Sequence, residues 1–559
     1  MKLLECIDVC QAFRILVIDP VPARIRIQRK LKRMRLGIDF GTTRVVVAHA
    51  DRGNFPLVSF EAPDGQVHDW FPPVVAINGV TRLYGWEAIA MQEDESWTVL
   101  RSLKRYLRSA NPHTQVSVAG QTVPLRKLMA EMMGSLHSEL IAHSNLVIDR
   151  GAEDEADSEG RFEVMLGVPA NANSNQRFLT EEAAQEAGFI VLGLLNEPSA
   201  AAIEFSHRNS AERKSRAGSG LVVYDLGGGT FDVSLVTMGE TEHTVVASDG
   251  IPNLGGDDFD EILAELALES LGEHGRLSAV EKHRLLEECR EKKESLNPNT
   301  RKVTIDMERV RASWEQVTIP VDAYYERCRP LIESTRVVVE NLLAAHSEGA
   351  LDTLYVTGGA AELPPVARIL RENFGRKVRR SAYMRSASAI GLAIRAAAAG
   401  DQGAGQAFDL SPDRLNDQFN QNFGIWRETD SGGTILFDLI FARGVHLPAP
   451  GEPPLRSERV YRPAHNIGHF RYLECTQLNE QGQPTGEIVN WDQVQFPFDP
   501  ELQQHPDLAS VPVALLSDSN GLMIREEYSC DSNGKLRVKI SAEPTGFTRE
   551  FSIAQSARS

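Results

Sequence analysis

Two short segments, far apart in the chain, carry residues suited to holding phosphate groups and a metal ion. Residues 36–43 and 221–230 each begin with an apolar run, reach one aspartate (Asp39 or Asp225), and end in glycine and threonine. Glycine lets backbone N–H groups close around phosphate oxygens, threonine hydroxyls add hydrogen bonds, and a carboxylate can hold Mg²⁺ through water. We interpret the two segments as turns that grip a triphosphate and its metal from opposite sides.

Each turn is expected to lie between two β-strands, because the apolar residues 45–48 and 231–236 follow the two turns directly. A single glycine-rich turn would be weak evidence for phosphate binding, since many such turns only reverse the chain. Two related copies in one chain are much stronger evidence for phosphate binding. The chain contains no GxxxxGK[ST] segment, so a Walker-type phosphate loop is excluded.

Composition shifts divide the chain into four parts. Residues 1–33 include a basic stretch and are predicted to be a flexible N-terminal extension. In residues 34–399 apolar runs alternate with helical patterns, which is typical of an α/β domain. Residues 400–421 are rich in Gln, Asp, Asn and Gly and predict a linker. Residues 422–559 contain short β-type runs and an Asn-Gly turn, so we expect a β-sandwich there.

Charge and composition exclude several classes of protein. The 559 residues include 59 Lys and Arg against 77 Asp and Glu, a net charge of −18, which argues against nucleic-acid binding. No apolar run approaches the ~18 residues of a membrane span. The six cysteines are scattered without a CxxC pair, so we expect buried thiols in a reducing compartment and a cytoplasmic location.

Further segments, which follow one another along residues 35–400, resemble the motifs of known protein families. The doubled turn resembles the actin-like ATPase superfamily. The other segments resemble the seventy-kilodalton heat-shock chaperone (DnaK-type) family, and they are Gly167-Val168-Pro169-Ala170, Asn175-Gln176-Arg177, Glu186-Ala187-Gly188-Phe189, residues 196–203 (NEPSAAAI), residues 254–260 (LGGDDFD) and residues 354–359 (LYVTGG) with Leu363-Pro364.

The resemblance implies a fold and an activity. It implies a two-lobed actin-like ATPase domain, built from a duplicated ribonuclease-H-like fold, followed by a β-sandwich that resembles a substrate-binding domain. The implied activity is hydrolysis of ATP to ADP and phosphate, with Mg²⁺ and with K⁺ as a further candidate ion. The implied function is that of a chaperone in protein folding and stress response.

The resemblance also assigns roles to single residues. Asp39 and Asp225 would organise Mg²⁺, Lys104 would stabilise charge near the γ-phosphate, and Glu197 and Asp232 would lie near the attacking water. The expected catalytic residues are Lys104, Glu197, Asp225, Thr230 and Asp232. The expected nucleotide-binding residues are Gly41, Thr42, Thr43, Gly227, Gly228, Gly229, Thr230, Gly255, Gly256, Lys293, Gly358 and Gly359.

The adenosine end departs from the family's pattern. Arg290 stands where the family usually has Glu, Glu294 where many members have Arg, and Arg385 where an acidic residue is usual. Ala360 and Glu362 replace the usual Ser and Arg after the Gly-Gly pair. Since a guanidinium stacked on adenine contributes ~0.5–2 kcal/mol, we expect ATP to bind more weakly than in a typical member.

Communication between the domains is a separate expectation. Pro169 and Arg177 match positions that relay the nucleotide state in the family, but residues 407–412 (AFDLSP) are a poor copy of the hydrophobic linker. The β-sandwich would bind unfolded or extended polypeptide, and a J-domain protein and a nucleotide exchange factor are candidate partners. The alternatives are a nucleotide-sensing scaffold with little turnover, a small-molecule kinase of the same superfamily, and an actin-like filament protein.

Overall fold

A computed structural model of the chain describes most of residues 33–552. The described ranges are 33–107, 110–147, 162–170, 172–209, 218–239, 242–273, 276–346, 351–400, 414–416, 418–419, 421–428, 435–448, 451–516 and 521–552. The predicted extension, apart from Arg33, and the linker hexapeptide 407–412 lie outside these residues.

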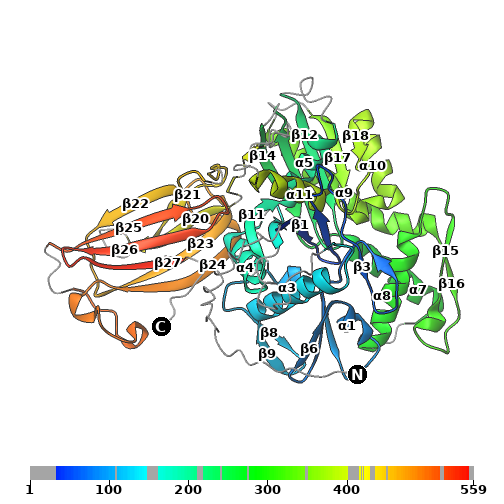
Figure 1. The fold of residues 1–559 in the computed structure, drawn as a ribbon, viewed down its shortest axis with the longest axis horizontal. Coiled ribbons are helices and arrows are strands. Elements are labelled where there is room, and N and C mark those ends of the chain that lie inside the picture. Colours follow the sequence, from blue (N-terminus) through cyan, green and yellow to red (C-terminus); the bar gives the residue numbers. More distant parts are fainter. Residues whose placement is uncertain are drawn as a thin grey trace, which may run out of the picture. The chain divides into compact units, whose positions relative to one another are not determined.

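Two β-sheets with related topology form the α/β part (Figure 1). In each sheet a hairpin of antiparallel strands comes first, and further strands join the hairpin's first strand in parallel. The first sheet has the order β11 (Ile190–Asn196), β10 (Phe162–Val168), β1 (Met34–Phe40) and β2 (Val45–His49). The second has the order β18 (Val378–Arg380), β17 (Leu351–Thr357), β12 (Gly220–Leu226), β13 (Phe231–Thr237), β14 (Glu242–Ile251) and β19 (Arg414–Asn416).

Helices cover these sheets because strand side chains alternate between the two faces. In β12, Leu221 and Val223 pack on helix α5 (Glu197–Arg208). Val222 and Tyr224 belong to the core that helix α9 (Val321–Ala345) covers on the opposite face. The remaining covering helices are α3 (Leu125–Ala142), α4 (Ser174–Glu186), α10 (Pro364–Phe374) and α11 (Ala387–Gly400).

Helices α5 and α11 join the two halves of the α/β part, each of which is built around one of the two sheets. Ala200 and Ile203 of α5 pack with Leu392 and Ala396 of α11, and the two helices lie side by side in Figure 1. A Cβ atom at Gly391 would overlap the carbonyl of Ala200, so the two helices approach more closely than a side chain would allow. This contact sets how the turns of the two sheets can face each other.

Smaller elements are inserted in each half. The first half carries β3 (Phe60–Glu61), β4 (Val67–His68), β5 (Val74–Asn78), β6 (Thr81–Tyr84), α1 (Gly85–Ala90), β7 (Thr98–Arg101), α2 (Leu103–Leu107), β8 (Gln115–Val118) and β9 (Gln121–Pro124). The second carries α7 (Gly256–Leu271), α8 (Ala279–Glu294), β15 (Lys302–Ile305), η3 (Met307–Arg309), β16 (Val317–Pro320), η4 (Gly359–Glu362) and η5 (Gly375–Lys377).

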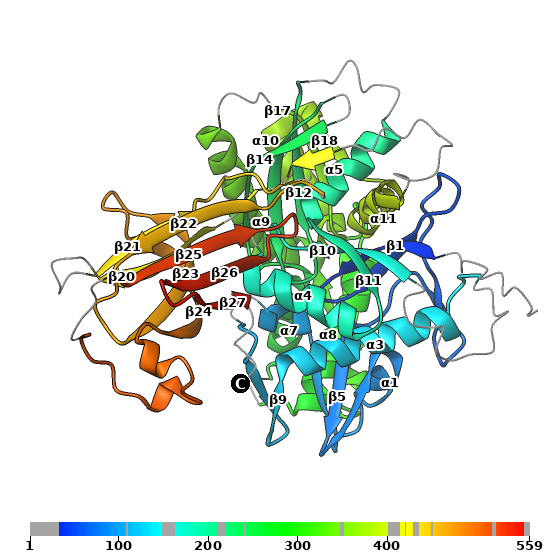
Figure 2. The ribbon, with the colours of Figure 1, turned by 60° about the vertical axis from the view of Figure 1, so that its left-hand side comes forward.

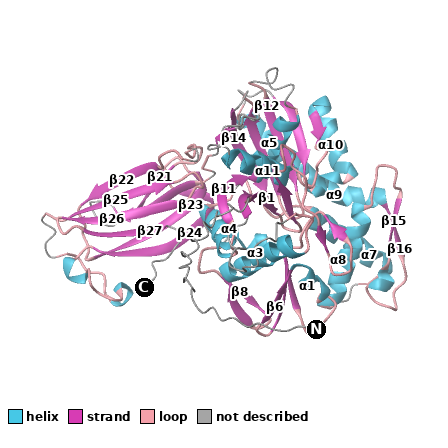
Figure 3. Cartoon of the chain, viewed as in Figure 1, coloured by secondary structure: helices cyan, strands magenta, loops and turns pink. Residues whose placement is uncertain are grey.

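The C-terminal part is a β-sandwich, as predicted. One sheet has the order β21 (Ile435–Phe441), β20 (Asn422–Glu428), β23 (Ile467–Leu478) and β24 (Pro484–Pro497). The other has the order β22 (Leu455–Tyr461), β25 (Met523–Cys530), β26 (Leu536–Glu543) and β27 (Phe547–Ser552). Its described helices are only the short η7 (Pro500–Leu502) and η8 (Leu508–Ser510), and Figures 2 and 3 show this contrast with the α/β part.

A charged cluster lies inside this sandwich. Glu526 of β25 is fully buried, and its carboxylate accepts hydrogen bonds from Arg427, Tyr461 and Tyr528. Arg427 of β20 also donates to Asp438 of β21 at 2.6 Å. The cluster therefore joins strands of both sheets by charge-assisted hydrogen bonds.

The structure also bears on the predicted linker, the cysteines and the expected absence of membrane-spanning helices. Part of the predicted linker, β19, adds a parallel strand to β14. Cys289, Cys328, Cys475 and Cys530 are free and buried, as expected, whereas Cys6 and Cys10 lie outside the described residues. In the part of the chain that the structure describes, no helix has both the length and the apolar character needed to cross a membrane.

Candidate active site

The two predicted turns line one cavity. The first turn lies between β1 and β2, and the second lies between β12 and β13, so each sheet contributes the end of its central hairpin. Both turns border a cavity of about 710 Å³. The duplicated hairpins, which are far apart in sequence, therefore meet at a single site.

Glycines allow the backbone to approach closely on both sides of this cavity. A Cβ atom at Gly228 would lie 2.5 Å from the Thr43 hydroxyl of the opposite turn, and one at Gly255 would lie 2.6 Å from the Gly228 carbonyl oxygen. Gly358 has φ of +89°, a conformation that favours glycine, and a Cβ atom there would be 2.5 Å from an Asp225 carboxylate oxygen. Larger side chains would fill the space between the turns.

Four carboxylates gather at the centre of the cavity: Asp39 at the end of β1, Asp225 in β12, Asp232 in β13, and Glu197, the first residue of α5. Burial raises the pKa of Asp39 to about 7 and that of Asp232 to about 6, and the charge of Glu197 adds to both shifts. Burial also raises the pKa of Asp225 well above its ordinary value, and Glu197 and Asp39 raise it further. So much buried negative charge favours a bound cation.

Lys104 of α2 faces these carboxylates. Its ammonium group donates a hydrogen bond to Glu197, and the two side chains are only 8% and 9% exposed. Burial alone would lower the pKa of Lys104, but Glu197 and Asp39 together raise it above the ordinary value. Lys104 is therefore a fixed positive charge beside these four buried carboxylates.

Most of the predicted site residues border the cavity. Those on its wall are Asp39, Gly41, Thr42, Thr43, Lys104, Glu197, Asp225, Gly227, Gly228, Thr230, Asp232, Gly256, Lys293, Gly358 and Gly359. Gly229 and Gly255 lie just behind the wall, where Gly229 approaches Thr42 and Gly255 approaches Gly228. The structure thus brings together every residue predicted to bind nucleotide or metal, whereas Pro169 and Arg177 lie elsewhere.

A comparison with known proteins decides the family. Residues 35–410 match the family described as Hsp70 protein. The chain belongs to the Hsp70 family. The predicted membership and the predicted fold class are therefore confirmed.

Relatives within this family share about a third of their aligned residues with the chain. A "Chaperone protein HscA homolog" of Methylibium petroleiphilum is 31% identical over 386 residues, which cover 65% of this chain and 58% of that protein. A "Chaperone protein HscA" of Enterobacter sp. is 30% identical over 376 residues, with the same coverage. A third, from Laribacter hongkongensis, is 32% identical over 386 residues. The matched part thus spans 58% of the length of these relatives.

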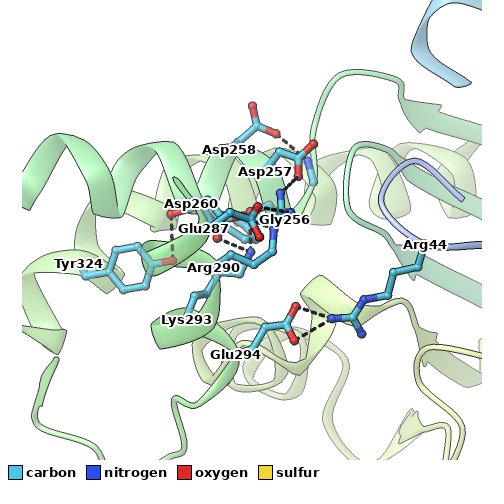
Figure 4. Close-up of polar contacts among 12 residues, drawn as sticks. Arg44, Gly256, Asp257, Asp258, Asp260, Glu287, Arg290, Lys293, Glu294 and Tyr324 are labelled. Atoms are coloured by element: carbon cyan, nitrogen blue, oxygen red, sulfur yellow. Dashed lines mark hydrogen bonds and ion pairs between the residues drawn. The ribbon is translucent and has the colours of Figure 1, made fainter. Parts of the chain in front are cut away.

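The end of the cavity that α8 (Ala279–Glu294) lines, where the sequence predicts the adenosine contacts, contains a dense ion-pair network in this Hsp70-family chain (Figure 4). Arg290 of α8 donates to Asp257 at 3.0 Å, to Asp260 at 3.2 Å and to Glu287 at 2.9 Å. Lys293, one turn along α8, lies 2.7 Å from Asp260. Both cations are therefore held by carboxylates of this chain.

The other departures from the family's pattern compensate one another. Arg385 pairs with Glu362 at 2.6 Å and with Glu294 at 2.9 Å. The acidic residues at 294 and 362 thus face Arg385, one of the two arginines that stand where an acid is usual. Glu294 also accepts two 2.9 Å hydrogen bonds from Arg44 (Figure 4), whose guanidinium lies 5.1 Å from the Trp70 ring.

Three arginines near the site were missed from the sequence. Arg44, Arg101 and Arg105 belong to the first half and pair with Glu294, Glu287 and Asp257 of the second half. These ion pairs cross the cavity mouth and hold its two sides together. Arg105 could have been suspected from the sequence only because it directly follows Lys104. The acidic partners of all three arginines lie more than 150 residues away in the chain, so no local pattern indicates the pairs.

The two predicted relay residues lie on the side of the α/β part that contacts the β-sandwich. Arg177 of α4 donates to Asn196 at 2.6 Å, so it connects α4 to the end of β11, next to Glu197. Pro169 follows β10 and is half-buried. Beside them, Glu474 of β23 in the sandwich accepts a hydrogen bond from the Ser174 backbone N–H at 3.1 Å and another from its hydroxyl at 2.5 Å.

The Glu474 contact predicts a pH dependence of stability. Burial raises the pKa of Glu474 to about 7, although Ser174 opposes the shift. Between about pH 4.5 and pH 7 the folded chain therefore binds more protons than the unfolded chain, and stability falls as the pH rises through this window. The free-energy difference should be on the order of 1–3 kcal/mol.

Thermal unfolding of the wild type and Glu474→Gln at pH 5 and pH 8 checks this expectation. The substitution should stabilise the chain relative to the wild type at pH 8 more than at pH 5. Glu480→Gln is the matched control, because Glu480 follows the same strand and is exposed. An equal effect of Glu474→Gln at both pH values would contradict the expectation.

Proposed function

We propose that this chain binds Mg²⁺–ATP between the two turns, hydrolyses it to ADP and phosphate, and binds extended polypeptide through the β-sandwich. The observation that carries the proposal is the single cavity where two glycine turns enclose buried carboxylates and the Lys104–Glu197 pair. Its size suits a nucleotide, since ligand pockets commonly measure ~300–1,000 Å³.

The residues present fit a magnesium ion and a triphosphate. Asp39 is close enough to the buried Asp225 for its charge to raise the pKa of Asp225, so a divalent cation between the two carboxylates would relieve the repulsion. Bound Mg²⁺ would neutralise charge on the phosphate groups during transfer to water. Asp232 and Thr230, whose side chains hydrogen-bond each other, are the candidate contacts for K⁺.

Lys104 and Glu197 have complementary roles in the proposed hydrolysis. The fixed charge of Lys104 would stabilise negative charge that develops on the γ-phosphate. Glu197 would orient the attacking water, because the β11–α5 junction holds its carboxylate at the cavity and Lys104 donates a hydrogen bond to it. The nearby backbone N–H groups of both turns would hold the phosphates.

Polypeptide binding is proposed for the β-sandwich. Extended peptides can bind through backbone hydrogen bonds to a sheet edge or cleft, with pockets for alternate side chains. Strand β21 lies at the edge of its sheet, and its Ile435 and Leu436 are 64% and 47% exposed. The relatives' names as chaperones support the proposal, which includes a J-domain protein and a nucleotide exchange factor as partners.

Steady-state phosphate release from ATP, with and without an unfolded polypeptide, tests the proposed function. We expect magnesium-dependent release that increases when the polypeptide is present. Release that is absent at every magnesium and polypeptide concentration would contradict ATP hydrolysis. Phosphate release that does not change when polypeptide is added would contradict the expected coupling of polypeptide binding to ATP hydrolysis.

A nucleotide-sensing scaffold with slow turnover is the second candidate. It is favoured by the ion pairs from Arg44, Arg101 and Arg105 across the cavity mouth, because these pairs must break before the two sides separate. Persistent binding of ATP without phosphate release would distinguish such a scaffold from the proposed ATPase.

Breaking the Arg44–Glu294 pair should accelerate nucleotide release. Glu294→Gln removes one charge from a half-buried pair that contributes ~0.2–1 kcal/mol, so a fluorescent ADP analogue should dissociate ~1.4–5-fold faster in a stopped-flow chase. Glu269→Gln is the matched control, since Glu269 pairs with Arg327 on the outside of the second half. An unchanged dissociation rate in Glu294→Gln would contradict a role for the pair in closing the cavity.

A further inference from the structure

A basic surface lies at one edge of the second sheet, outside the candidate active site. Residues 364–385 contain seven arginines and lysines and a single acidic residue, Glu372, in a chain with a net charge of −18. The basic surface is defined here by six exposed residues of this segment, on α10, η5 and β18, which are Arg368, Arg371, Arg376, Lys377, Arg379 and Arg380.

These six cations are not neutralised by the rest of the described chain. None of them lies within ion-pair distance of a carboxylate among the described residues, so their charges face solvent. The neighbouring helix α9 is different, because Arg327, Arg329 and Arg336 all pair with glutamates. The arginines on α9 are thus paired with glutamates, whereas the six cations of the basic surface have no such partner among the described residues.

The basic surface surrounds an open strand edge. Strand β18 pairs in parallel with β17 through Val378, Arg379 and Arg380, and it is the terminal strand of the sheet. Figure 1 shows β18 beside α10 at the margin of the second sheet. The outer side of β18 therefore offers backbone groups to which an added strand could pair.

Local stability explains only part of this arrangement. Arg371 in the last turn of α10 interacts favourably with the helix dipole, and one charged residue is enough to discourage edge pairing between identical chains. Neither effect requires six cations on three consecutive elements that have no ion-pair partner among the described residues. The concentration of like charge instead lowers stability by repulsion unless an anionic partner neutralises it.

We propose that the basic surface binds an acidic, extended polypeptide segment of a partner protein, which adds a strand to the outer edge of β18. The six cations attract the acidic side chains, and the strand edge supplies backbone hydrogen bonds. A protein segment is favoured over nucleic acid because the chain as a whole is acidic and repels a long polyanion. This interaction is separate from the proposed binding of ATP and of polypeptide by the sandwich.

Fluorescence anisotropy with two labelled peptides tests the proposal on the full chain. One dodecapeptide alternates Glu and Val, and the other alternates Glu and Pro, so the two carry the same charge but the second lacks half of the backbone N–H donors. We expect the Glu/Val peptide to bind ~10-fold more tightly than the Glu/Pro peptide, and its binding to weaken as salt is raised from about 50 to 200 mM.

Two triple variants with the same loss of charge locate the peptide. Arg376→Gln/Arg379→Gln/Arg380→Gln should weaken binding of the Glu/Val peptide ~10-fold. Arg327→Gln/Arg329→Gln/Arg336→Gln on α9 should change it less than about twofold. Thermal unfolding of both variants checks that they fold.

Several results would overturn the proposal. They are absence of peptide binding, equal weakening by the two triple variants, and equal affinity for the two peptides. Tighter binding of a seven-nucleotide thymidine oligomer than of the peptide would assign the surface to nucleic acid. Dimerisation that only the first triple variant abolishes would assign it to a second copy of the chain.

Discussion

Lys104→Ala should reduce steady-state phosphate release from ATP by about 10²–10³-fold, because it removes a fixed charge that would stabilise the transferring phosphate. Lys104 is buried beside Glu197, and the next cation of its helix, Arg105, is paired with Asp257 at 3.0 Å. ATP binding, measured by isothermal titration calorimetry, should change much less than the rate. The phosphate turns and both aspartates remain in place.

Two control variants separate this chemical role from a structural one. Lys104→Ala leaves the Glu197 carboxylate buried without its partner, so Lys104→Met/Glu197→Gln removes both charges and should fold normally but remain inactive. Lys127→Ala removes an exposed lysine that lies 3.8 Å from Glu131 and should leave the rate unchanged. A folded Lys104→Ala protein with a rate within threefold of the wild type would contradict the assignment of Lys104.

Glu526→Ala should destabilise the β-sandwich by about 3–5 kcal/mol, because it removes a fully buried acceptor that Arg427, Tyr461 and Tyr528 share, although Arg427 keeps its pair with Asp438. Glu526 is fully buried, and Arg427, Tyr461 and Tyr528 all donate to it. Urea unfolding followed by tryptophan fluorescence can report this change, since Trp426 and Trp491 lie in the same sandwich.

A neighbouring residue provides the matched control for this prediction. Glu527→Ala removes a half-exposed carboxylate of the same strand that pairs with Lys539 at 2.9 Å, and it should cost less than about 1 kcal/mol. The double variant Glu526→Leu/Arg427→Met removes both buried charges and should lose less stability than Glu526→Ala alone. Equal losses for Glu526→Ala and Glu527→Ala would contradict the importance of the buried cluster.

The residues of the two turns are enough to predict them. Asp39 and Asp225 stand at the ends of apolar runs, and the glycines and threonines that follow show where each strand must turn. The α/β character of residues 34–399 rests on the same local patterns, because apolar periodicity and glycine positions act within a few residues, whereas the two-lobed actin-like fold was implied by the family resemblance. The β-sandwich likewise follows from short alternating runs such as Leu536–Glu543.

Lys104 and Glu197 show the limit of that reasoning. The sequence around Lys104 does not distinguish it from a surface cation, and only the resemblance to a family indicated a catalytic role. The structure brings it to Glu197, 93 residues further along the chain, inside the same cavity. The roles of both residues remain predictions until the variants are measured.

The charge network around α8 was the least predictable part of the candidate site. Arg290, Glu294, Glu362 and Arg385 were recognised as departures from the family's pattern, and the expected weaker ATP binding remains a prediction. That these charges pair with one another, and that Arg44 joins them, depends on helices and turns from different parts of the chain. No local pattern records such a pairing.

The amino-acid order alone determined the features that depend on near neighbours, namely the strands, the helices, the two turns and the residue types that suit phosphate and metal. Only the tertiary structure decided which charges meet, as with Lys104 and Glu197 in the cavity or Arg427 and Glu526 in the sandwich. The physical reason is the range of the interactions. Backbone preferences and apolar periodicity act over a few residues, whereas the pKa and the partner of a buried charge depend on every element packed around it.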